Sequence, residues 1–361
     1  MVRPRFCNTK VKQLKRGDGS LTTVPEEMRQ VATDFLQDSL SAEALSSEAL
    51  ECRQHIWDKV RPKVTSTMRQ TLDAPLQEEE VAEAIRTLLH TSCLGEDGLS
   101  PTLFQEYWEL VKTDLCQAFQ DILDTGSIPT EVGEGLIFLI PKGDGPSEDI
   151  RRWRPITTLN MIYKILAKTI SLRVQPLLPH LIHASQTGFI KERSILDNIF
   201  TFWETTALAH RSQQDLAIIL LDFEKAYDKV DWGFLEGTLL RFGFFDKWVK
   251  GTVALYSSAS SRVLLAGGKG PSFQLARSVR QGCPLAPFLF LFFAESLSLF
   301  LTAEDSGVKG ISLPLSISEE ILDAEFADDT GLFLKGASTN FSQQKSYSYL
   351  LYCIGRKNQL E

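Results

Sequence analysis

The feature that most constrains this chain is an apolar run that ends directly in an acidic residue. Ala217 to Leu221 is continuously apolar, and Asp222 follows it at once. Such a run predicts a buried strand, because a strand covered on both faces need not alternate. An ionised carboxylate at its end is costly unless a cation meets it. Taken alone, an acid of this kind is more often a helix cap or a salt-bridge partner.

A second acidic signal lies 106 residues further along, where Asp328 and Asp329 stand between two short apolar arms in ILDAEFADDTGLFL (321–334). The pattern predicts a β-hairpin with both acids at its tip. Acidic tips are common for turn reasons alone, so this signal is also weak by itself. Together, however, two strand ends can bring three carboxylates to one place on a sheet.

Three clustered carboxylates predict a divalent-metal site. Oxygen ligands that leave open positions suit Mg²⁺, with Mn²⁺ as an alternative ion. Two such ions about 4 Å apart can activate an attacking hydroxyl and stabilise the leaving oxygen of an in-line displacement at phosphorus. Like charges held this close favour a bound cation over an empty site. The residues alone therefore predict metal-dependent phosphoryl transfer.

The composition restricts the setting of that chemistry. With 43% hydrophobic residues among 361, the chain can form one large or two moderate cores and is too apolar to be disordered. Its six cysteines include no Cys-x-x-Cys pair, which favours a reducing, intracellular compartment over zinc or disulfide frameworks. No signal peptide is indicated. The apolar residues 284–301 are interrupted by Glu295 and predict a buried helix rather than a membrane span.

The net charge of −8 conceals a split between two regions. Residues 74–134 hold 13 acids and 2 bases, a net of −11, whereas residues 136–193 hold 9 bases and 4 acids, a net of +5. A polyanion needs only a local positive track. The overall charge therefore neither indicates nor excludes a nucleic-acid partner.

The remaining patterns predict an α+β domain, because helices mix with a few non-alternating strands. Residues 1–73 read as a loosely packed extension. Helices are expected at about 76–89, from an N-cap at Ser100 to about 126, and at 161–178 and 194–210. Strands are expected at 136–140, 217–221 and 263–266, and on both sides of Asp328 and Asp329.

Five ordered blocks resemble the reverse transcriptase region of non-LTR (LINE-type) retrotransposons, over about residues 76–335. They are SCLGEDGLSPTLFQEYW (92–108), LIPKGDGPSEDIRRWRPITTLN (139–160), QTGFIKERSILDNI (186–199), LAIILLDFEKAYDKVDW (216–232), and RQGCPLAPFLF (280–290) followed by FADD (326–329). One block would be modest evidence, and the specificity comes from all five in order.

The resemblance implies the right-hand polymerase fold and an RNA-directed DNA polymerase. Residues 1–73 would be an N-terminal extension, residues 74–215 the fingers, and residues 216–361 the palm, an antiparallel sheet backed by helices and cut off before the thumb. The partners would be an RNA template with a DNA primer, and deoxynucleoside triphosphates. The resemblance also implies a location in the nucleus and no membrane. The sequence does not indicate an oligomeric state.

The family's catalytic roles fall on matching positions of this chain. Asp222 and Asp328 would ligate both metal ions, the carbonyl of Phe223 would complete one shell, and Asp329 would support the site. Tyr227 would close the sugar pocket against a 2′-hydroxyl, the alternative being an ordinary core aromatic.

Two further groups of residues follow from the resemblance. Residues beside the incoming nucleotide would be Gln281 and Gly282, while Lys142 and Arg154 would grip its triphosphate unless they are ordinary solvated bases. Contacts with template or primer would come from Gln186, Gly188, Phe189, Arg193, Phe326 and Ala327.

Some features depart from the family pattern. The family usually has a proline before Gly95, and here Ser92, Cys93 and Leu94 stand in its place, which leaves the rigidity of that loop open. The main alternative is a catalytically inactive remnant of such an element that binds nucleic acid. A palm-type nucleotide cyclase or an RNA-dependent RNA polymerase is disfavoured by Tyr227 and by RQGCPL.

Overall fold

The computed structural model describes residues 11–42, 44–88, 94–142, 147–223, 225–313 and 320–336. The chain forms two compact units, and each is assembled from separate stretches. The first unit comprises residues 1–42, 74–172 and 250–286. The second comprises residues 43–73, 173–249 and 287–361. The chain thus passes from one unit to the other five times.

The first unit is built on a five-stranded sheet in the order β4-β3-β6-β7, with β8 also paired to β6. β3 and β4 are antiparallel, whereas β3 and β6 are parallel. The strands expected at 136–140 and 263–266 are present as β3 and β6. The bounds are β3 (Gly135–Pro141), β4 (Trp153–Leu159), β6 (Ser260–Leu265), β7 (Gly268–Lys269) and β8 (Phe273–Gln274).

The helix expected over 100–126 is divided in two at Tyr107. Ser100 caps the first part by accepting a hydrogen bond from the Leu103 amide at 3.3 Å, as expected. Gly126, with a φ of +69°, ends the second part. The helices of this region are α4 (Glu78–Thr87), α5 (Pro101–Glu106), α6 (Trp108–Thr125), α7 (Thr130–Gly133), the 3-10 turn η1 (Ile150–Arg152), α8 (Met161–Val174) and α12 (Asp246–Ser257).

The loop at Gly95 keeps its turn, since the Gly98 amide donates to the Gly95 carbonyl at 3.2 Å. A Cβ on Gly95 would lie 2.6 Å from the Cα of Asn160, so only glycine fits this close approach. Ser92 and Cys93, where the proline is missing, lie outside the described residues.

The expected loose packing of residues 1–73 is wrong for their described part. After a short hairpin of β1 (Leu14–Lys15) and β2 (Leu21–Thr22), helix α1 (Pro25–Leu40) packs against β6. Helix α2 (Ser47–Trp57) contributes Ile56 to the core of the second unit, and α3 (Ser66–Asp73) follows. Apolar residues at helical spacing, among them Met28, Ala32 and Leu36, are buried between charged neighbours that hid the pattern.

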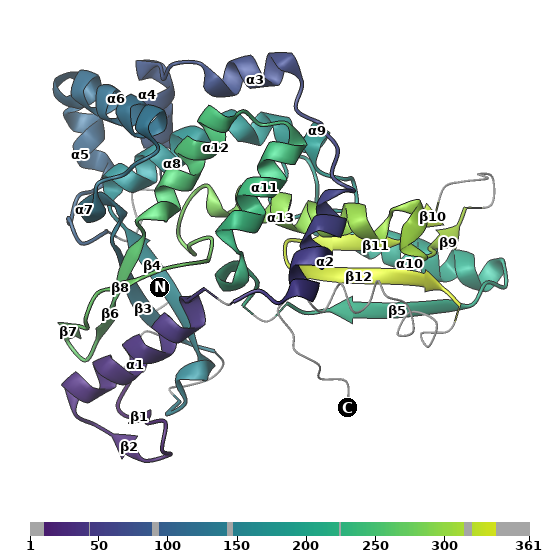
Figure 1. The fold of residues 1–361 in the computed structure, drawn as a ribbon, viewed down its shortest axis with the longest axis horizontal. Coiled ribbons are helices and arrows are strands. Elements are labelled where there is room, and N and C mark those ends of the chain that lie inside the picture. The colour runs from purple at the N-terminus through teal and green to yellow at the C-terminus, as the bar shows by residue number, and fades with distance from the viewer. Residues whose placement is uncertain are drawn as a thin grey trace, which may run out of the picture. The chain divides into compact units, whose positions relative to one another are not determined.

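The second unit contains a three-stranded antiparallel sheet in the order β11-β12-β5, whose strands lie side by side in Figure 1. Strands β11 (Asp323–Phe326) and β12 (Asp329–Lys335) form the expected hairpin, although its turn is Ala327-Asp328. Strand β5 (Leu216–Leu221) pairs with β12 from Leu216↔Lys335 to Leu221↔Thr330. Among the described strands it has a neighbour on one side only, so it lies at the edge of the sheet, and Leu220 is 79% exposed. The expectation of a fully buried strand is therefore wrong.

The two faces of this sheet pack against different helices. Leu332 and Leu334 join one core with Ile56 of α2, Phe234 of α11 (Trp232–Phe242) and Phe300 of α13 (Ala286–Leu301). On the other face, Phe333 packs against α10 (Ile195–Arg211), and its ring centroid lies 6.2 Å from that of Phe202. The alternation of residues along β12 thus separates two layers of helix.

The other short elements of the second unit complete the chain path. They are the 3-10 turns η2 (Gln175–Leu177), η3 (Ala226–Lys229) and η4 (Glu304–Ser306), helix α9 (Leu178–Leu181), and strands β9 (Ile311–Ser312) and β10 (Glu320–Ile321). The mixture of helices and sheets agrees with the expected α+β class.

The long apolar segment 284–301 is helical, as expected, and forms α13. Most of its residues are buried, including Glu295 at 1% exposure. Within the described part of the chain, no helix is both long and apolar enough to cross a membrane.

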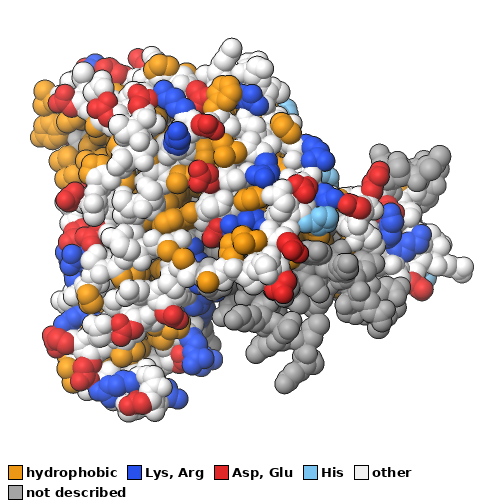
Figure 2. Space-filling model, viewed as in Figure 1, with side chains coloured by type: hydrophobic (Ala, Val, Ile, Leu, Met, Phe, Trp, Pro, Cys, Tyr) orange, Lys and Arg blue, Asp and Glu red, His pale blue; other side chains and the backbone are white. Residues whose placement is uncertain are grey.

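Acidic and basic side chains are interspersed over the face of the molecule drawn in Figure 2. On this face neither sign of charge forms an uninterrupted track.

Leu332→Ala should destabilise the second unit, because Leu332 is 0% exposed in its core. Removing a buried leucine side chain typically costs about 2–5 kcal/mol of unfolding free energy. Leu220→Ala, at an exposed position of the neighbouring strand β5, serves as the control. Urea titration followed by tryptophan fluorescence should show a large loss of unfolding free energy for Leu332→Ala alone. Equal losses for the two variants would contradict the layer assignment.

Candidate active site

The acidic residues singled out in the sequence follow directly from the pairing of β5 with β12. The last pair of the ladder is Leu221↔Thr330. Asp222 and Asp329 are the next residue on each strand, so the register brings these two acids to the same end of adjacent strands. Both side chains are exposed and line one surface hollow, together with Leu221 and Phe326. Asp328, in the turn, is half-buried.

The electrostatics of the turn show that these carboxylates affect one another. Burial is the largest cause that raises the pKa of Asp328 above its usual value. The charges of Asp329 and Asp222 raise that pKa further, while a backbone hydrogen bond opposes the rise. Mutual repulsion between carboxylates is relieved when a cation lies between them. The site therefore favours a positive ligand.

The residues fit a divalent ion that brings some of its own ligands. In the described ranges, no three Asp, Glu, His or Cys side chains form a ready-made metal cage. Mg²⁺ commonly binds through one or two carboxylates, keeps several waters and shares phosphate oxygens with a substrate. Exposed Asp222 and Asp329, with half-buried Asp328 in the adjacent turn, have the oxygen donors and the open side that such an ion requires.

Tyr227 stands beside this acidic cluster in the turn η3. Its ring stacks on Phe290 of α13, with centroids 4.8 Å apart and planes 8° apart. Burial raises the pKa of Tyr227, and the charge of Asp328 raises it further. The hydroxyl therefore stays protonated near Asp328, on a ring held by stacking.

Asp231 initiates the helix that follows Tyr227. It caps α11, because its carboxylate accepts a hydrogen bond from the Phe234 amide at 2.7 Å. It also forms an ion pair with Arg53 at 3.0 Å. Asp231 thus fixes the chain that follows Tyr227 and belongs to the scaffold.

The segment expected to cradle a template lies between α9 and α10 and packs along β11. Gln186 is 1% exposed and forms a bridge with Glu325. Phe189 has a φ of +59° and is 47% exposed. The guanidinium of Arg193 is directed inward and donates to the carbonyls of Pro179, Ile182, His183 and Gln186. Of these side chains, that of Phe189 is the most exposed to solvent.

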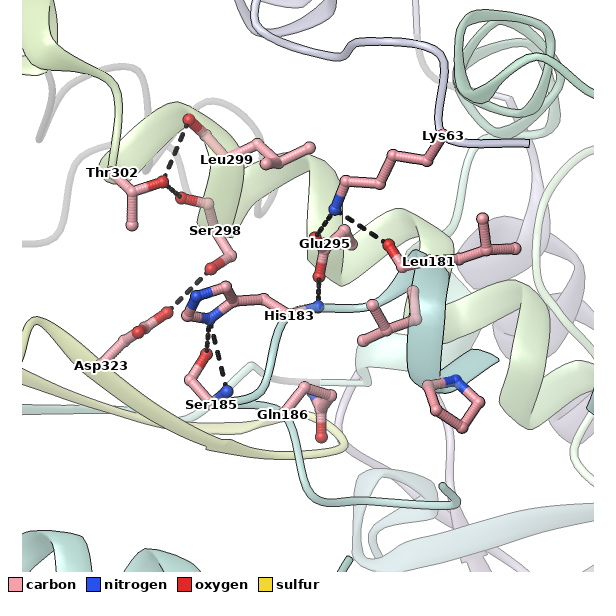
Figure 3. Close-up of polar contacts among 12 residues, drawn as sticks. Lys63, Leu181, His183, Ser185, Gln186, Glu295, Ser298, Leu299, Thr302 and Asp323 are labelled. Carbon is pink, nitrogen blue, oxygen red and sulfur yellow. Dashed lines mark hydrogen bonds and ion pairs between the residues drawn. The ribbon is translucent and has the colours of Figure 1, made fainter. Parts of the chain in front are cut away.

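The acidic hairpin rests on a buried polar network that no motif in the sequence indicates (Figure 3). Glu295 of α13 accepts hydrogen bonds from Lys63 at 2.7 Å and from the His183 amide at 2.8 Å. Asp323 of β11 accepts one from Ser298 at 2.8 Å. The network ties α13 to the strand that leads into the acidic turn.

Glu325 is the most deeply enclosed acid of β11, at 3% exposure. Burial is the main cause that raises its pKa well above the usual value, and the charges of Asp323 and Glu295 add to the rise. The signal available in the sequence was the alternation DAEF, in which acids occupy the same face of a strand. Alternating acids in a strand usually predict a face exposed to solvent, whereas Asp323 and Glu325 are buried.

The two basic residues expected to bind phosphates lie in the first unit. Lys142 follows β3 directly, and its amide donates to the Arg152 carbonyl at 2.8 Å. Arg154 lies on β4, paired with Ile140. Both side chains are exposed at the same end of the β3–β4 hairpin, where they can meet an anion.

The segment 280–283 packs against β4, also within the first unit. The Thr157 amide donates to the Gln281 carbonyl at 3.2 Å. Gly282 has a φ of +112°, and a Cβ there would lie 2.3 Å from the Thr157 carbonyl oxygen. The neighbouring Arg280 is 1% exposed and donates to the carbonyls of Gly133 and Ser260. Only glycine satisfies this backbone position.

Comparison with known proteins gives a match to the family described as "Reverse transcriptase (RNA-dependent DNA polymerase)", over residues 140–351. The chain is 32% identical, over 291 residues, to the Transposon TX1 uncharacterized 149 kDa protein of Xenopus laevis, covering 81% of the chain and 22% of that protein.

Two further relatives are Pol polyproteins of the retrotransposable element R2. Identity is 26% over 258 residues for that of Popillia japonica and 24% over 255 residues for that of Drosophila melanogaster. Each alignment covers 71% of this chain, and 34% and 23% of the respective relatives. The chain therefore spans about a third or less of the length of these relatives.

Glu325→Gln should stabilise the protein increasingly as pH rises. A carboxyl whose folded pKa is raised contributes its full stability below its unfolded pKa and loses it as pH rises through the folded pKa. Asp323, Glu295 and Gln186 face this group, and the amide retains a donor toward Asp323 without a charge. Melting temperatures from pH 5 to pH 9 should diverge in favour of the variant. Glu236→Gln, at an exposed position of α11, is the control. A difference in melting temperature between Glu325→Gln and the wild type that does not vary with pH would contradict the raised pKa of Glu325.

Proposed function

We propose that this chain, which belongs to the reverse transcriptase (RNA-dependent DNA polymerase) family, catalyses RNA-directed DNA synthesis as part of a non-LTR retrotransposon protein. A primer 3′-hydroxyl would attack the α-phosphate of a deoxynucleoside triphosphate paired with an RNA template, and pyrophosphate would leave. The observation that carries the proposal is the β5–β12 register, which aligns Asp222 with the acidic turn of the hairpin. The expected partners are the template with its primer, and the expected location is the nucleus.

The acidic end of the sheet would hold the divalent ions. Asp222, Asp328 and the Phe223 carbonyl would be ligands, and Asp329 would support them from the first position of β12. Bound Mg²⁺ or Mn²⁺ lowers the pKa of the attacking hydroxyl and stabilises the leaving oxygen. The chain itself supplies a rigid arrangement of negative charge, since two of the acids stand at the end of paired strands.

The sugar would be selected by the ring of Tyr227. Stacking on Phe290 restricts this ring, and its protonated hydroxyl lies close enough to Asp328 to sense its charge. A ring held in this way can exclude a 2′-hydroxyl by steric overlap. This assignment makes the three-stranded sheet and its helices the palm of the polymerase.

The nucleotide's phosphates and base would meet residues of the first unit. Lys142 and Arg154 are exposed cations at one end of a β-hairpin, which suits a triphosphate. Gln281 and Gly282 would lie beside the base pair, where a residue without a Cβ permits close approach. These elements would belong to the fingers.

The template and primer would run along the segment 186–193 and the hairpin. Phe189 offers an exposed ring for base stacking, and Phe326 lines the hollow shared by Asp222 and Asp329. Gly188, Arg193 and Ala327 would shape this path through backbone position, because their polar groups or volume are committed within the fold. Gln186 would also act through position, because its side-chain amide is hydrogen-bonded within the fold.

Asp328→Asn and Asp222→Asn should each lower primer extension on an RNA template with Mg²⁺. A loss of at least about 100-fold is expected, because the variant lacks one charged ligand of the ion that would stabilise the transition state. Asp215→Asn removes an exposed acid that precedes the other end of β5 and should leave the rate unchanged. Equal incorporation by all variants would reject the catalytic proposal and favour an inactive remnant that binds nucleic acid.

Tyr227→Ala should increase the use of ribonucleotides relative to deoxynucleotides by about tenfold or more, because a hydroxyl would no longer overlap with the ring. Tyr227→Phe keeps the ring and should retain the discrimination. The ratio of kcat/KM for a matched ribonucleotide and deoxynucleotide pair measures the effect. If the alanine variant discriminated like the wild type, the assignment of Tyr227 to the sugar pocket would be wrong.

A further inference from the structure

The side chain of Gln186 uses every hydrogen-bonding position of its amide within the fold. Its Oε1 accepts from the Gly188 amide at 2.9 Å and from the Ala327 amide at 2.8 Å. Its Nε2 donates to Glu325 Oε2 and to the Ala327 carbonyl, both at 3.2 Å. A primary amide has two acceptor and two donor positions, so none is left for a nucleic acid.

Two of these bonds hold one residue of the acidic hairpin. Ala327 has a φ of +57°, a backbone conformation that residues other than glycine rarely adopt. It is 5% exposed, and both its amide and its carbonyl bind the same Gln186 side chain. A buried left-handed residue persists where its surroundings fix it. Gln186 is that fixing contact.

The backbone on both sides of Gln186 also binds β11, the strand that leads into the acidic turn. The Glu325 amide donates to the Ser185 carbonyl at 2.9 Å, and the Thr187 amide donates to the Glu325 carbonyl at 2.8 Å. A Cβ on Gly188 would lie 2.5 Å from the Ala327 nitrogen. The loop therefore lies against β11 through an isolated bridge at Glu325, and the amide of Gln186 can reach the turn.

We propose that Gln186 is a positioning residue for Asp328: its amide locks Ala327 in the left-handed conformation and thereby sets the direction of the acid that follows. The inference rests on the proposed function, because Asp328 is assigned there as a metal ligand. It requires an amide specifically, since the same side chain must accept from two amides and donate to a carbonyl and a carboxyl group. A glutamate of equal length lacks the donors, and an asparagine is one methylene shorter.

The chain offers a matched control for this contact. Gln214 also holds both backbone groups of one residue, since it donates to the Ser312 carbonyl and accepts from the Ser312 amide, both at 3.3 Å. Ser312 ends β9, and it is not part of the acidic hairpin. Gln214→Glu therefore breaks the same type of contact away from the acids.

The experiment compares Gln186→Glu with Gln214→Glu in the full chain. Gln186→Glu should lower the single-turnover rate of deoxynucleotide incorporation and weaken the binding of Mn²⁺ alone by about 10- to 100-fold, as loss of a contact that orients a metal ligand does. The KM for the nucleotide should change by less than about threefold, because the effect lies on positioning rather than on substrate binding. Gln214→Glu should stay within about twofold of the wild type.

Two readouts do not require turnover. Electron paramagnetic resonance measures Mn²⁺ binding, and mass spectrometry measures amide hydrogen exchange in the peptide 323–330, which should become faster in Gln186→Glu alone. If the wild type fails to extend a primer, the proposed function fails while these readouts still test the positioning of Asp328. Gln186→Met, which introduces no charge, replaces Gln186→Glu if the latter does not fold.

The outcomes separate a positioning role from general stability. Slower incorporation, weaker Mn²⁺ binding and faster hairpin exchange in the Gln186 variant, at a melting temperature comparable to that of Gln214→Glu, support the inference. Unchanged exchange and Mn²⁺ affinity, or equal losses in both variants, overturn it.

Discussion

The antiparallel pairing of β5 with β12 is the interaction on which the acidic site depends. Carboxylates repel one another, so side chains alone would not assemble them in the absence of a cation. The ladder of backbone hydrogen bonds from Leu216↔Lys335 to Leu221↔Thr330 supplies the necessary constraint, because its register determines which residues come next on each strand. A shift of one residue would direct Asp222 to the opposite face. The apolar side chains that pack on the two faces of the sheet oppose such a shift.

The interior below the hairpin is unusual in containing three enclosed carboxyl groups. Glu295 is satisfied by Lys63 and the His183 amide, Asp323 by Ser298, and Glu325 by Gln186. Buried polar groups of this kind are stable only when every partner is present. They therefore link α13, the loop before α10 and β11 into one arrangement. These buried contacts hold the strand that leads into the acidic turn, and so they make the turn rigid.

Much of the architecture could be predicted because apolar periodicity and turn chemistry are local. Ser100, Gly126 and the hairpin around Asp328 are in the expected roles. The errors have a common physical origin. The apolar run that ends in Leu221 does not reveal whether a strand is central or at an edge, and Leu220 is exposed. Helical spacing around Met28 was hidden by charged neighbours on the outer face of α1.

The candidate site could be predicted only in part, for a related reason. Asp222, Asp328 and Tyr227 were found because they occupy recognisable blocks. The structure brings Asp222 close enough to Asp328 to raise its pKa, and Asp328 close enough to Tyr227 to raise the pKa of its hydroxyl. The contacts of Gln186 with Ala327 join segments 141 residues apart, and nothing local indicates them. The burial of Glu325 could not be predicted either, because in the sequence a buried acid of an alternating strand has the same pattern as a solvent-exposed one.

The interleaving of the two units has a consequence for how such a protein can change. Because the chain alternates between them five times, neither unit corresponds to a continuous stretch of coding sequence. A single recombination event cannot transplant one unit without carrying parts of the other, and no terminal deletion yields either unit whole. Substitutions and loop insertions remain the available routes of variation. Subcloning faces the same restriction, so a recombinant study of either half requires a redesigned order of segments.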